Sequence, residues 1–361
     1  MKRILSIALF MILIFVSCFS FSCASNTYSH SFYYFNTQIQ LHSKNSKNFE
    51  KAVSELDQYF FSLEQTFSVS EENSFINSFN SSEKGSLFTL DTDFKKEIFE
   101  LCTFSYNFTD KKFNPAIFPL VKLWQFYPNY PVSNFEPPND EEISNILSSG
   151  ITDFSKIAID ENDFLIKPLS SMQLDLGGIL KGYALDKASE ILALNGINKG
   201  YINVGSSSLY LLEVDSLGVR HPRATQNKPL ILDLSLKKQK NLFVSTSGDY
   251  EKTYAYNDKV YSHIIDNKTG KPADTNILSA TLIGQNGGLL DAFSTALCLC
   301  THNSGDESSE LITFMNKILL SYPKTKIFVV YSDGDNKEIL TNQKQGENFT
   351  LLDTDYKIVN I

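Results

Sequence analysis

Cysteine is scarce in this sequence, and its spacing excludes two kinds of stabilising site. Five cysteines occur in 361 residues, and two of them, Cys18 and Cys23, follow an apolar N-terminal run. The other three are Cys102, Cys298 and Cys300, an odd number with no Cys-x-x-Cys spacing. This pattern excludes a disulfide framework and a cysteine-rich zinc site, so we expect these three to be buried apolar side chains.

A basic excess is also lacking. The 32 Lys and Arg residues are outnumbered by 41 Asp and Glu, which gives a formal charge of −9. A surface that binds the phosphates of nucleic acid needs the opposite balance, so no nucleic acid partner is expected. Tryptophan occurs once, whereas 28 Phe and 17 Tyr supply large side chains for a core, and 42% of all residues are apolar. The chain is therefore suited to one large domain or two modest ones.

The N-terminal apolar run is too short for a membrane-spanning helix. It covers residues 4–16 after Lys2 and Arg3, whereas a spanning helix needs roughly 20 apolar residues. We therefore predict an export signal over 1–22, a tether over 23–31 and a folded domain over 32–361. The residues before Cys18 and before Cys23 both resemble the lipobox of bacterial lipoproteins, so one of these cysteines is expected to carry lipid. An ordinary secretory signal is the alternative.

Hydrophobic periodicity predicts an α+β fold. Phe49, Val53, Leu56, Phe60, Leu63 and Phe67 alternate spacings of four and three, which is typical of one face of a helix. Helices are expected at 49–67, 94–108, 140–148, 291–300 and 308–319. Strands are expected at 32–41, 201–204, 209–214, 230–236, 242–245, 260–265, 278–283 and 326–331. Helices and strands cluster rather than alternate, which favours mixed or antiparallel sheets, and four prolines mark 127–138 as a surface loop.

The stretch Asp175-Leu-Gly-Gly-Ile-Leu-Lys181-Gly-Tyr is interpreted as a strand end, a Gly-Gly turn and the start of a helix. Glycines allow close backbone approach, and the free amides of a helix N-terminus can face phosphate oxygens. The GxxxxGK(S/T) spacing of a P-loop is absent. A purely structural turn is the alternative.

Asp291 and Thr295 are four residues apart, so on a helix they share one face and offer two hard oxygens to a cation. Mg²⁺ suits such a pair because it fills its remaining positions with water and substrate phosphate. Alternatively, Asp291 caps the helix and Thr295 bonds back to a carbonyl.

His263 lies in Tyr261–Gly270, a predicted strand that runs into a turn. A histidine can act as a base near neutral pH, although a structural histidine at a strand end is the alternative. The nearby Ser245–Tyr250 stretch supplies further hydroxyls in a predicted loop.

Taken together and in order, these segments resemble the FAD:protein FMN transferases, the ApbE family. DLGGILKGYALD, VSTSGDYEK, SHIIDNKTGKP and DAFSTAL carry the resemblance. Phe35-Asn36-Thr37 is similar to the family's MGT, residues 67–80 to its acidic loop, and residues 114–124 to its DxTVGPLVxLW. The resemblance covers nearly all of the chain after the signal, and it implies an ApbE-like fold of two intimately associated lobes.

The resemblance implies a role for particular residues. Mg²⁺ would be held by Asp291, Thr295 and the carbonyl of Gly178, with Ser294 close by, and His263 would be the functionally important histidine. FAD, the substrate, would be bound by Phe35, Ser70, Lys112, Phe113, Asn114, Asp175, Lys181 and Ile265. FMN would then pass to a Ser or Thr hydroxyl of an acceptor redox protein, and AMP would leave.

Some positions depart from the family pattern. Phe35 and Asn36 replace Met and Gly, and Asn114 replaces an acidic residue. Ser70 stands where an aromatic side chain is common, so water could compete for the phosphorus and hydrolysis of FAD to FMN and AMP is an alternative. A flavin-binding lipoprotein without chemistry and a structural surface protein are further alternatives. The expected location is outside the cytoplasm, anchored by lipid to a bacterial membrane and facing the periplasm.

Overall fold

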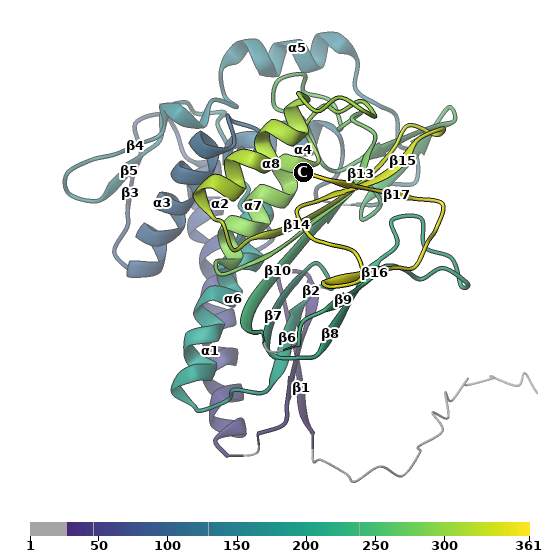
Figure 1. The fold of residues 1–361 in the computed structure, drawn as a ribbon. Helices are drawn as coiled ribbons and strands as arrows, with labels where there is room; N and C mark the ends of the chain where they lie inside the picture. Colours follow the sequence, from purple (N-terminus) through teal and green to yellow (C-terminus); the bar gives the residue numbers. More distant parts are fainter. Residues whose placement is uncertain (1–26, 46, 129, 238) are drawn as a thin grey trace, which may run out of the picture.

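A computed structural model describes residues 27–45, 47–128, 130–237 and 239–361 (Figure 1). The predicted signal over 1–22, both candidate lipidation cysteines and the first part of the predicted tether lie outside the described residues. Residues 28–31, at the end of that tether, form the beginning of strand β1 (Tyr28–Tyr34). Within the described part of the chain, no helix is both long and apolar enough to cross a membrane.

A nine-stranded sheet organises the molecule. Its order is β1-β2-β6-β7-β10-β13-β14-β15-β17, and every neighbouring pair is antiparallel except β15 and β17, which are parallel. The strands after β1 are β2 (Thr37–Ser43), β6 (Gly200–Val204), β7 (Ser208–Glu213), β10 (Lys240–Gly248), β13 (Ile277–Gly284), β14 (Lys326–Ser332), β15 (Lys337–Thr341) and β17 (Lys357–Asn360).

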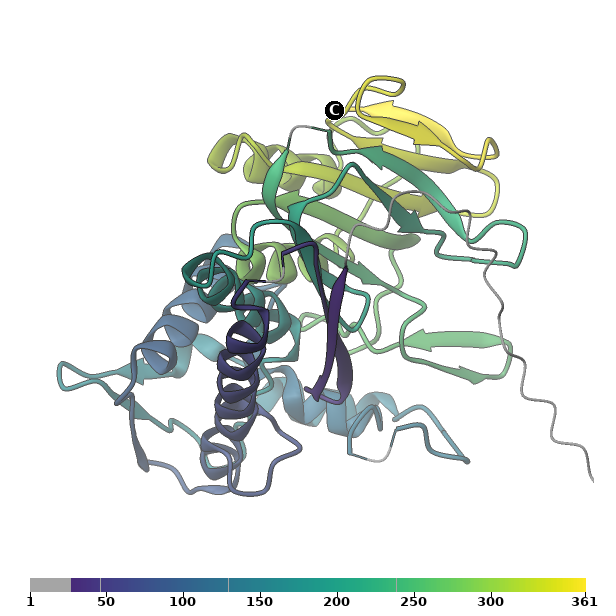
Figure 2. The same cartoon turned by 90° about the horizontal axis from the view of Figure 1, so that it is seen from below.

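Helices cover one face of this sheet (Figures 1 and 2). They are α1 (Phe49–Phe67), α2 (Phe75–Ser81), α3 (Asp93–Phe108), α6 (Gly177–Leu194), α7 (Gly287–Leu297) and α8 (Glu310–Ser321). The apolar residues that predicted α1 are the ones buried along it, because their spacing places them on the side that faces the core. Helix α7 is buried along nearly its whole length, since it lies between the sheet and the outer helices.

Smaller units complete the fold. A sheet of β8 (Ser216–Arg220), β9 (Leu230–Ser235) and β16 (Phe349–Leu351) packs through a second apolar cluster with side chains from the main sheet. A third cluster joins α4 (Phe118–Leu123) and α5 (Asp140–Ser149) to the hairpin of β11 (Thr253–Tyr256) and β12 (Lys259–Ser262). The remaining elements are β3 (Leu87–Thr89), β4 (Ala158–Ile159), β5 (Phe164–Ile166) and two short 3₁₀ helices, Pro115–Ile117 and Phe154–Lys156.

The predicted α+β class with mixed and antiparallel sheets is confirmed, as are the helices expected at 49–67, 94–108 and 140–148. The single strand expected at 32–41 is wrong: Phe35 and Asn36 both have positive φ and turn the chain, so β1 and β2 form a hairpin. The strand expected at 260–265 ends at Ser262, and no strand leads directly into α6, because residues 167–176 contain none. The predicted loop at 245–250 is wrong at its start, because β10 continues to Gly248.

Candidate active site

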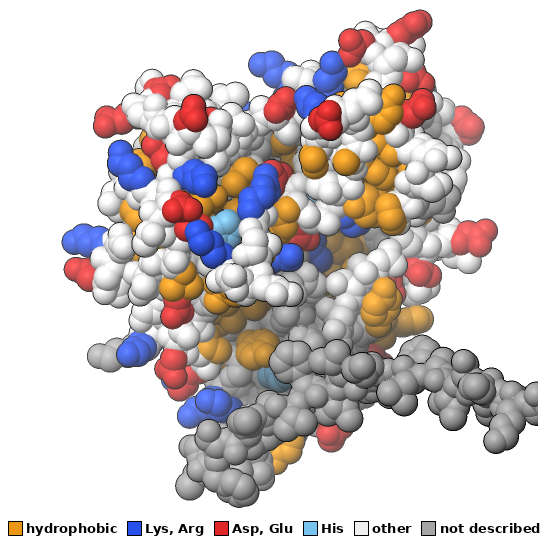
Figure 3. Space-filling view, turned by 90° about the vertical axis from the view of Figure 1, so that its right-hand side faces the viewer, with side chains coloured by type: hydrophobic (Ala, Val, Ile, Leu, Met, Phe, Trp, Pro, Cys, Tyr) orange, Lys and Arg blue, Asp and Glu red, His pale blue; other side chains and the backbone are white. Residues whose placement is uncertain are grey.

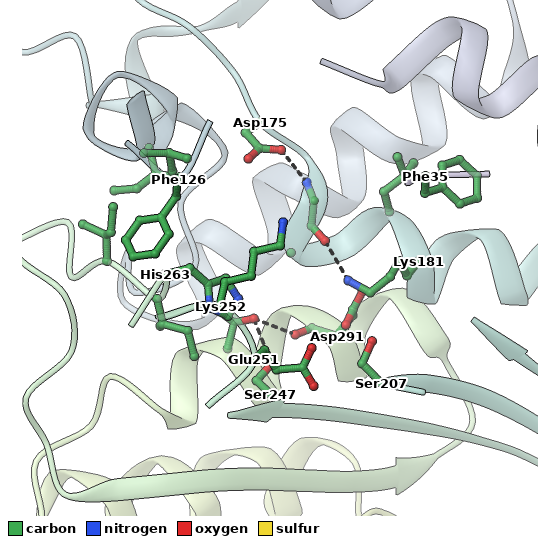
Figure 4. A pocket seen from close by; sticks show the side chains of 18 of the residues that line it. Phe35, Phe126, Asp175, Lys181, Ser207, Ser247, Glu251, Lys252, His263 and Asp291 are labelled. Atoms are coloured by element: carbon green, nitrogen blue, oxygen red, sulfur yellow. Dashed lines mark hydrogen bonds between the residues drawn. The ribbon is translucent and has the colours of Figure 1, made fainter. Parts of the chain in front are cut away.

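A cavity of about 430 Å³ lies where the hydroxyl-rich end of β10 meets the N-terminus of α6 and the segment that precedes α4. This volume is in the range of sites that bind small molecules and cofactors. The face shown in Figure 3 is hollowed, and Lys and Arg side chains gather around the hollow together with a histidine. Figure 4 shows the labelled side chains that line the cavity from several elements.

Two glycines allow α6 and α7 to cross in contact below the cavity. A Cβ on Gly182 would overlap the carbonyl of Gly287, and a Cβ on Gly287 would overlap the carbonyl of Gly182. This close approach lets the Asp291 carboxylate of α7 accept the Gly182 N–H through Oδ2, at 3.1 Å. Its Oδ1 accepts the Ser245 hydroxyl of β10, at 2.8 Å. Asp291 is only 3% exposed, so its orientation is fixed by these two donors.

Hydroxyl groups surround this carboxylate. Ser247 of β10 lies 2.8 Å from the Ser294 hydroxyl and 3.2 Å from the Thr295 hydroxyl. Ser294 and Thr295 also donate back to the Asp291 carbonyl, at 2.9 and 3.2 Å. The alternative that the Thr295 hydroxyl bonds back to a helix carbonyl is therefore confirmed, and Thr295 also lines the cavity. The capping alternative for Asp291 is wrong, because Asn286 is the N-cap of α7 and Asp291 is five residues further along.

The donors at this point fit a hard divalent cation. Gly178 lies beside Thr295, since a Cβ on Gly178 would be 3.7 Å from the Thr295 hydroxyl, and both residues line the cavity with Asp291. No group of three or more His, Cys, Asp or Glu that could hold a metal occurs among the described residues. One carboxylate with hydroxyl and carbonyl oxygens is a donor set suited to Mg²⁺, which takes much of its coordination from water and substrate phosphate.

His263 faces the cavity beside Lys252. The β11–β12 hairpin pairs Thr253 with Ser262, so the next residues outward, Lys252 and His263, lie opposite each other. The backbone N–H of His263 donates to the backbone carbonyl of Lys252 at 3.0 Å. Burial, and then the charges of Lys252 and Lys181, lower the pKa of His263 to about 4. The ring is therefore neutral at physiological pH. Its Nδ1 is buried and has no hydrogen-bond partner among the described residues.

Two cations and one carboxylate flank the start of α6 (Figure 4). The Asp175 carboxylate accepts the Gly177 N–H at 2.8 Å, and Lys181 donates to the Gly177 carbonyl at 3.2 Å. The pKa of Asp175 is raised overall, because the effect of burial exceeds the opposing effects of the Gly177 N–H, Lys252 and Lys181. Neither lysine forms an ion pair with another residue of the described chain, so both ammonium groups are available to an anion in the cavity.

Aromatic rings form the apolar walls. Phe113 packs against the start of α6. The ring centroids of Phe126 and His263 are 6.3 Å apart, and the two rings meet edge to face. The Tyr127 hydroxyl donates to the Val69 carbonyl at 2.7 Å and thereby ties its loop to the segment after α1. Ser70, on that segment, is exposed and accepts a hydrogen bond from Asn36 at 2.9 Å. The cavity therefore offers apolar surface for rings as well as charge for an anion.

Twelve of the thirteen predicted site residues line this one cavity: Phe35, Ser70, Lys112, Phe113, Asn114, Asp175, Gly178, Lys181, His263, Ile265, Asp291 and Thr295. Ser294 does not line it and is fully buried behind Ser247. Lys112 pairs with Glu310 at 2.6 Å, and Asn114 bonds Thr152 and Ala116, so both side chains already have structural partners. The functional roles of the thirteen residues stay predictions.

Several cavity residues were not among the predicted site residues: Ser207, Ser247, Glu251, Lys252, Phe126 and Tyr127. Ser247 belongs to the hydroxyl-bearing stretch noted in the sequence, and Glu251 and Lys252 end the VSTSGDYEK segment, but no role was predicted for them. A signal for Lys252 did exist. The pair Asn257-Asp258 is of the residue types that tolerate positive φ in tight turns. In the structure both have positive φ and turn the β11–β12 hairpin, and this two-residue turn fixes the register that places Lys252 opposite His263. For Phe126 and Tyr127 no local pattern distinguishes a cavity wall from a core.

Comparison with known proteins supports the resemblance read from the motifs. The model of the ApbE family matches residues 33–313, more than three quarters of the chain. A protein of Klebsiella pneumoniae named FAD:protein FMN transferase is 30% identical over 236 residues, which cover 62% of this chain and 71% of that protein. A Chlamydia muridarum protein of the same name is 29% identical over 262 residues, covering 70% and 77%.

Solved structures agree with the fold. The crystal structure of an ApbE protein from Thermotoga maritima superposes with a TM-score of 0.71 at 26% identity, covering 85% of this chain and 94% of that one. The flavinyl transferase ApbE of Pseudomonas stutzeri, in its apo form, gives 0.70 at 20% identity and covers 88% and 94%, which supports the fold alone. The predicted ApbE-like fold is confirmed.

Proposed function

Because this chain belongs to the ApbE family, we propose that it is an Mg²⁺-dependent FAD:protein FMN transferase. It would cleave the diphosphate of FAD, join FMN through its phosphate to a Ser or Thr hydroxyl of an acceptor redox protein, and release AMP. The observation that carries this proposal is that one cavity is lined both by Gly178, Asp291 and Thr295 and by two lysines, Lys181 and Lys252. The cavity thus combines positive charge for a diphosphate, oxygen ligands for a cation and apolar walls for the flavin and adenine rings.

The lysines and the α6 N-terminus support binding of the diphosphate. The two ammonium groups and the positive end of the α6 dipole favour the anion, and Phe113 and Phe126 offer apolar surface to the flavin or the adenine. A Mg²⁺ ion held by Asp291, Thr295 and the Gly178 carbonyl would supply neutralisation of the charge that develops as the diphosphate breaks.

In this proposal His263 removes the proton from the acceptor hydroxyl. Its neutral ring can accept the hydroxyl proton while the hydroxyl oxygen forms a bond to the phosphorus of the FMN half. The bond between that phosphorus and the bridging oxygen breaks, and AMP leaves with the bridging oxygen. The proton stays on His263 until it is released to water, so the enzyme returns to its starting state.

Hydrolysis is the second candidate, and the exposure of Ser70 at the cavity rim favours it. A small hydroxyl side chain covers less of a bound dinucleotide than an aromatic ring would, so water can reach the phosphorus more readily. In that case FAD would give free FMN and AMP.

The test is incubation of the purified protein with FAD, Mg²⁺ and a candidate acceptor protein. A covalently flavinylated, fluorescent acceptor band supports transfer. Free FMN and AMP without a labelled acceptor support hydrolysis, and intact FAD in the presence of Mg²⁺ supports a lipoprotein that only binds flavin.

We also propose export and lipid anchoring, on the basis of residues 1–23 of the sequence. The enzyme would then act on the periplasmic side of a bacterial membrane, where it would meet exported acceptors. Labelling of cells with a radioactive fatty acid tests this, with Cys18→Ala and Cys23→Ala as the two variants. Loss of label in one variant identifies the lipidated cysteine, and no label in the wild-type protein contradicts the anchor.

A further inference from the structure

Asp186 lies on α6 outside the cavity, and the mechanism above does not use it. Its carboxylate accepts the backbone N–H of Gly287 through Oδ1, at 2.6 Å, and that of Gly288 through Oδ2, at 2.9 Å. These glycines are the first two residues of α7. The first amides of a helix have no partner within the helix, and a carboxylate beside them also meets the positive end of the helix dipole. Asp186 therefore fastens the N-terminus of α7 to α6.

A second carboxylate joins the same helices, but here the acceptor is on α7 and the donor is on α6. Asp291 of α7 accepts the Gly182 N–H of α6 at 3.1 Å. Between the two attachments the helices touch backbone to backbone at Gly182 and Gly287. The two carboxylates and the two glycines together restrict sliding and rotation of α7 along α6. We call this arrangement the α6–α7 clasp.

The carboxylate of Asp186 forms no other hydrogen bond within the described structure. Glu97, Tyr183, Lys187 and Glu190 line the same shallow groove, yet the two α7 amides are the only hydrogen-bond donors to this carboxylate among the described residues. Its hydrogen bonds therefore act on the placement of α7 and on no neighbouring side chain.

We propose that Asp186 is a positioning residue for the divalent-cation site, an inference that rests on the function proposed above. The expected ligands come from both helices, because Gly178 belongs to the start of α6 whereas Asp291 and Thr295 belong to α7. Movement of α7 along α6 changes the separation of these oxygens, and Mg²⁺ tolerates little departure from octahedral geometry. Residues that orient metal ligands from behind typically change metal affinity by about 10- to 100-fold when replaced.

The test compares Mn²⁺ binding by the full chain and its variants, followed by the EPR signal of the free ion. Burial raises the pKa of Asp186 to about 7, so the titrations are run near pH 8, where the carboxylate is ionised. Asp186→Asn places an NH₂ group against one of the two amides, and we expect the dissociation constant for Mn²⁺ to rise about 10-fold or more. The Mg²⁺ concentration that gives half-maximal turnover should rise by a similar factor, with kcat at saturating Mg²⁺ changed much less.

Two matched controls separate positioning from charge and from general stability. Glu190→Gln removes a carboxylate from the same groove that makes no bond to α7. Asn286→Ala removes the N-cap of α7, which accepts the Leu289 N–H at 2.8 Å, but leaves the α6–α7 clasp in place. Both controls should keep the wild-type Mn²⁺ affinity within about twofold, a small change beside the effect expected of a residue that orients ligands.

Each outcome decides the matter. Wild-type Mn²⁺ affinity in Asp186→Asn overturns the inference, and so does an equal loss in Asn286→Ala. Failure of the unmodified protein to bind Mn²⁺ counts against the proposed function instead. If Asp186→Asn does not fold, Asp186→Ser takes its place, since a hydroxyl still accepts one amide. Hydrogen exchange of the Gly287 and Gly288 amides in the unmodified protein should slow when Mn²⁺ binds, and unchanged exchange contradicts the coupling.

Discussion

Replacement of Asp291 by Asn separates chemistry from stability. The Asp291 carboxylate is buried and accepts hydrogen bonds from the Gly182 N–H and the Ser245 hydroxyl. An alanine would leave both donors without an acceptor, at about 1–3 kcal/mol each, which is a large part of a typical total stability of roughly 5–15 kcal/mol. An asparagine keeps one oxygen for the Gly182 N–H, and the Ser245 hydroxyl can rotate to accept from the new NH₂ group. We therefore expect Asp291→Asn to lower the free energy of unfolding by only about 1 kcal/mol.

The effect on turnover should be much larger. Asp291 is the only carboxylate among the expected cation ligands, so its loss should lower the rate of transfer by more than about 100-fold, beyond the usual effect of residues that merely support a ligand. FAD binding should weaken less, since Lys181, Lys252 and the aromatic walls are unchanged. The assay measures AMP release and covalent acceptor fluorescence for the rate, flavin fluorescence for binding, and urea unfolding for stability.

A second buried carboxylate provides the control. Asp353 is 4% exposed, accepts from Lys228 at 2.7 Å and pairs with His221, and it does not line the cavity. Asp353→Asn should destabilise the protein at least as much as Asp291→Asn and yet leave the rate of transfer within a few-fold of wild type. Equal loss of turnover and FAD binding in Asp291→Asn, or equal loss of turnover in both variants, would refute the reasoning.

Three further predictions follow from the described contacts. His263→Gln should slow transfer by about 10²- to 10⁴-fold, the usual contribution of a general base, with FAD binding retained; normal transfer would contradict the assigned role. Burial lowers the pKa of His263 to about 4 in the folded protein, so between that pH and about 6.5 the unfolded chain binds one more proton than the folded chain. The contribution of His263 to stability is therefore complete above this pH window and is lost as the pH falls through it. The value of kcat should stay level from neutral pH down to about 5, and a midpoint near 6.5 would disprove the lowered pKa. Tyr127→Phe removes the bond to the Val69 carbonyl and should raise KM for FAD by about fivefold, equivalent to about 1 kcal/mol, with kcat unchanged; a kcat effect of the same size would assign Tyr127 to the chemistry.

Much of the helical layer could be predicted from the sequence. The four-and-three spacing along α1 also marks its buried stripe, because that helix packs one apolar face against the core. On α3 the extent of the helix was predictable but its buried face was not: Ile98, Phe99 and Cys102 are buried, whereas Phe104 is exposed. The first strand could not be predicted correctly, because Phe35 is a bulky residue that rarely adopts the positive φ it has in this turn, and Asn36 alone is a weak turn signal. The extent of β10 was missed for a different reason: Ser245 and Ser247 resemble loop residues, but on this strand they face α7 and the cavity.

The candidate site was predictable where one helix carries it and less so where the chain must fold back. Asp291 and Thr295 share a helix, so their common direction follows from spacing alone. The placement of Lys252 opposite His263 depends on the register of the β11–β12 hairpin. The bond from Asp186 to the start of α7 spans about a hundred residues, and no local pattern reports it.

The measurement that tests the account most directly is the stoichiometry of FAD turnover with Mg²⁺ and then with EDTA in its place. With Mg²⁺ and an acceptor protein, we expect one AMP released for each flavin joined covalently to the acceptor, and with EDTA neither product. AMP release that continues unchanged in EDTA would contradict the proposed cation site, and AMP release with Mg²⁺ but no covalent flavin would contradict the transferase in favour of hydrolysis.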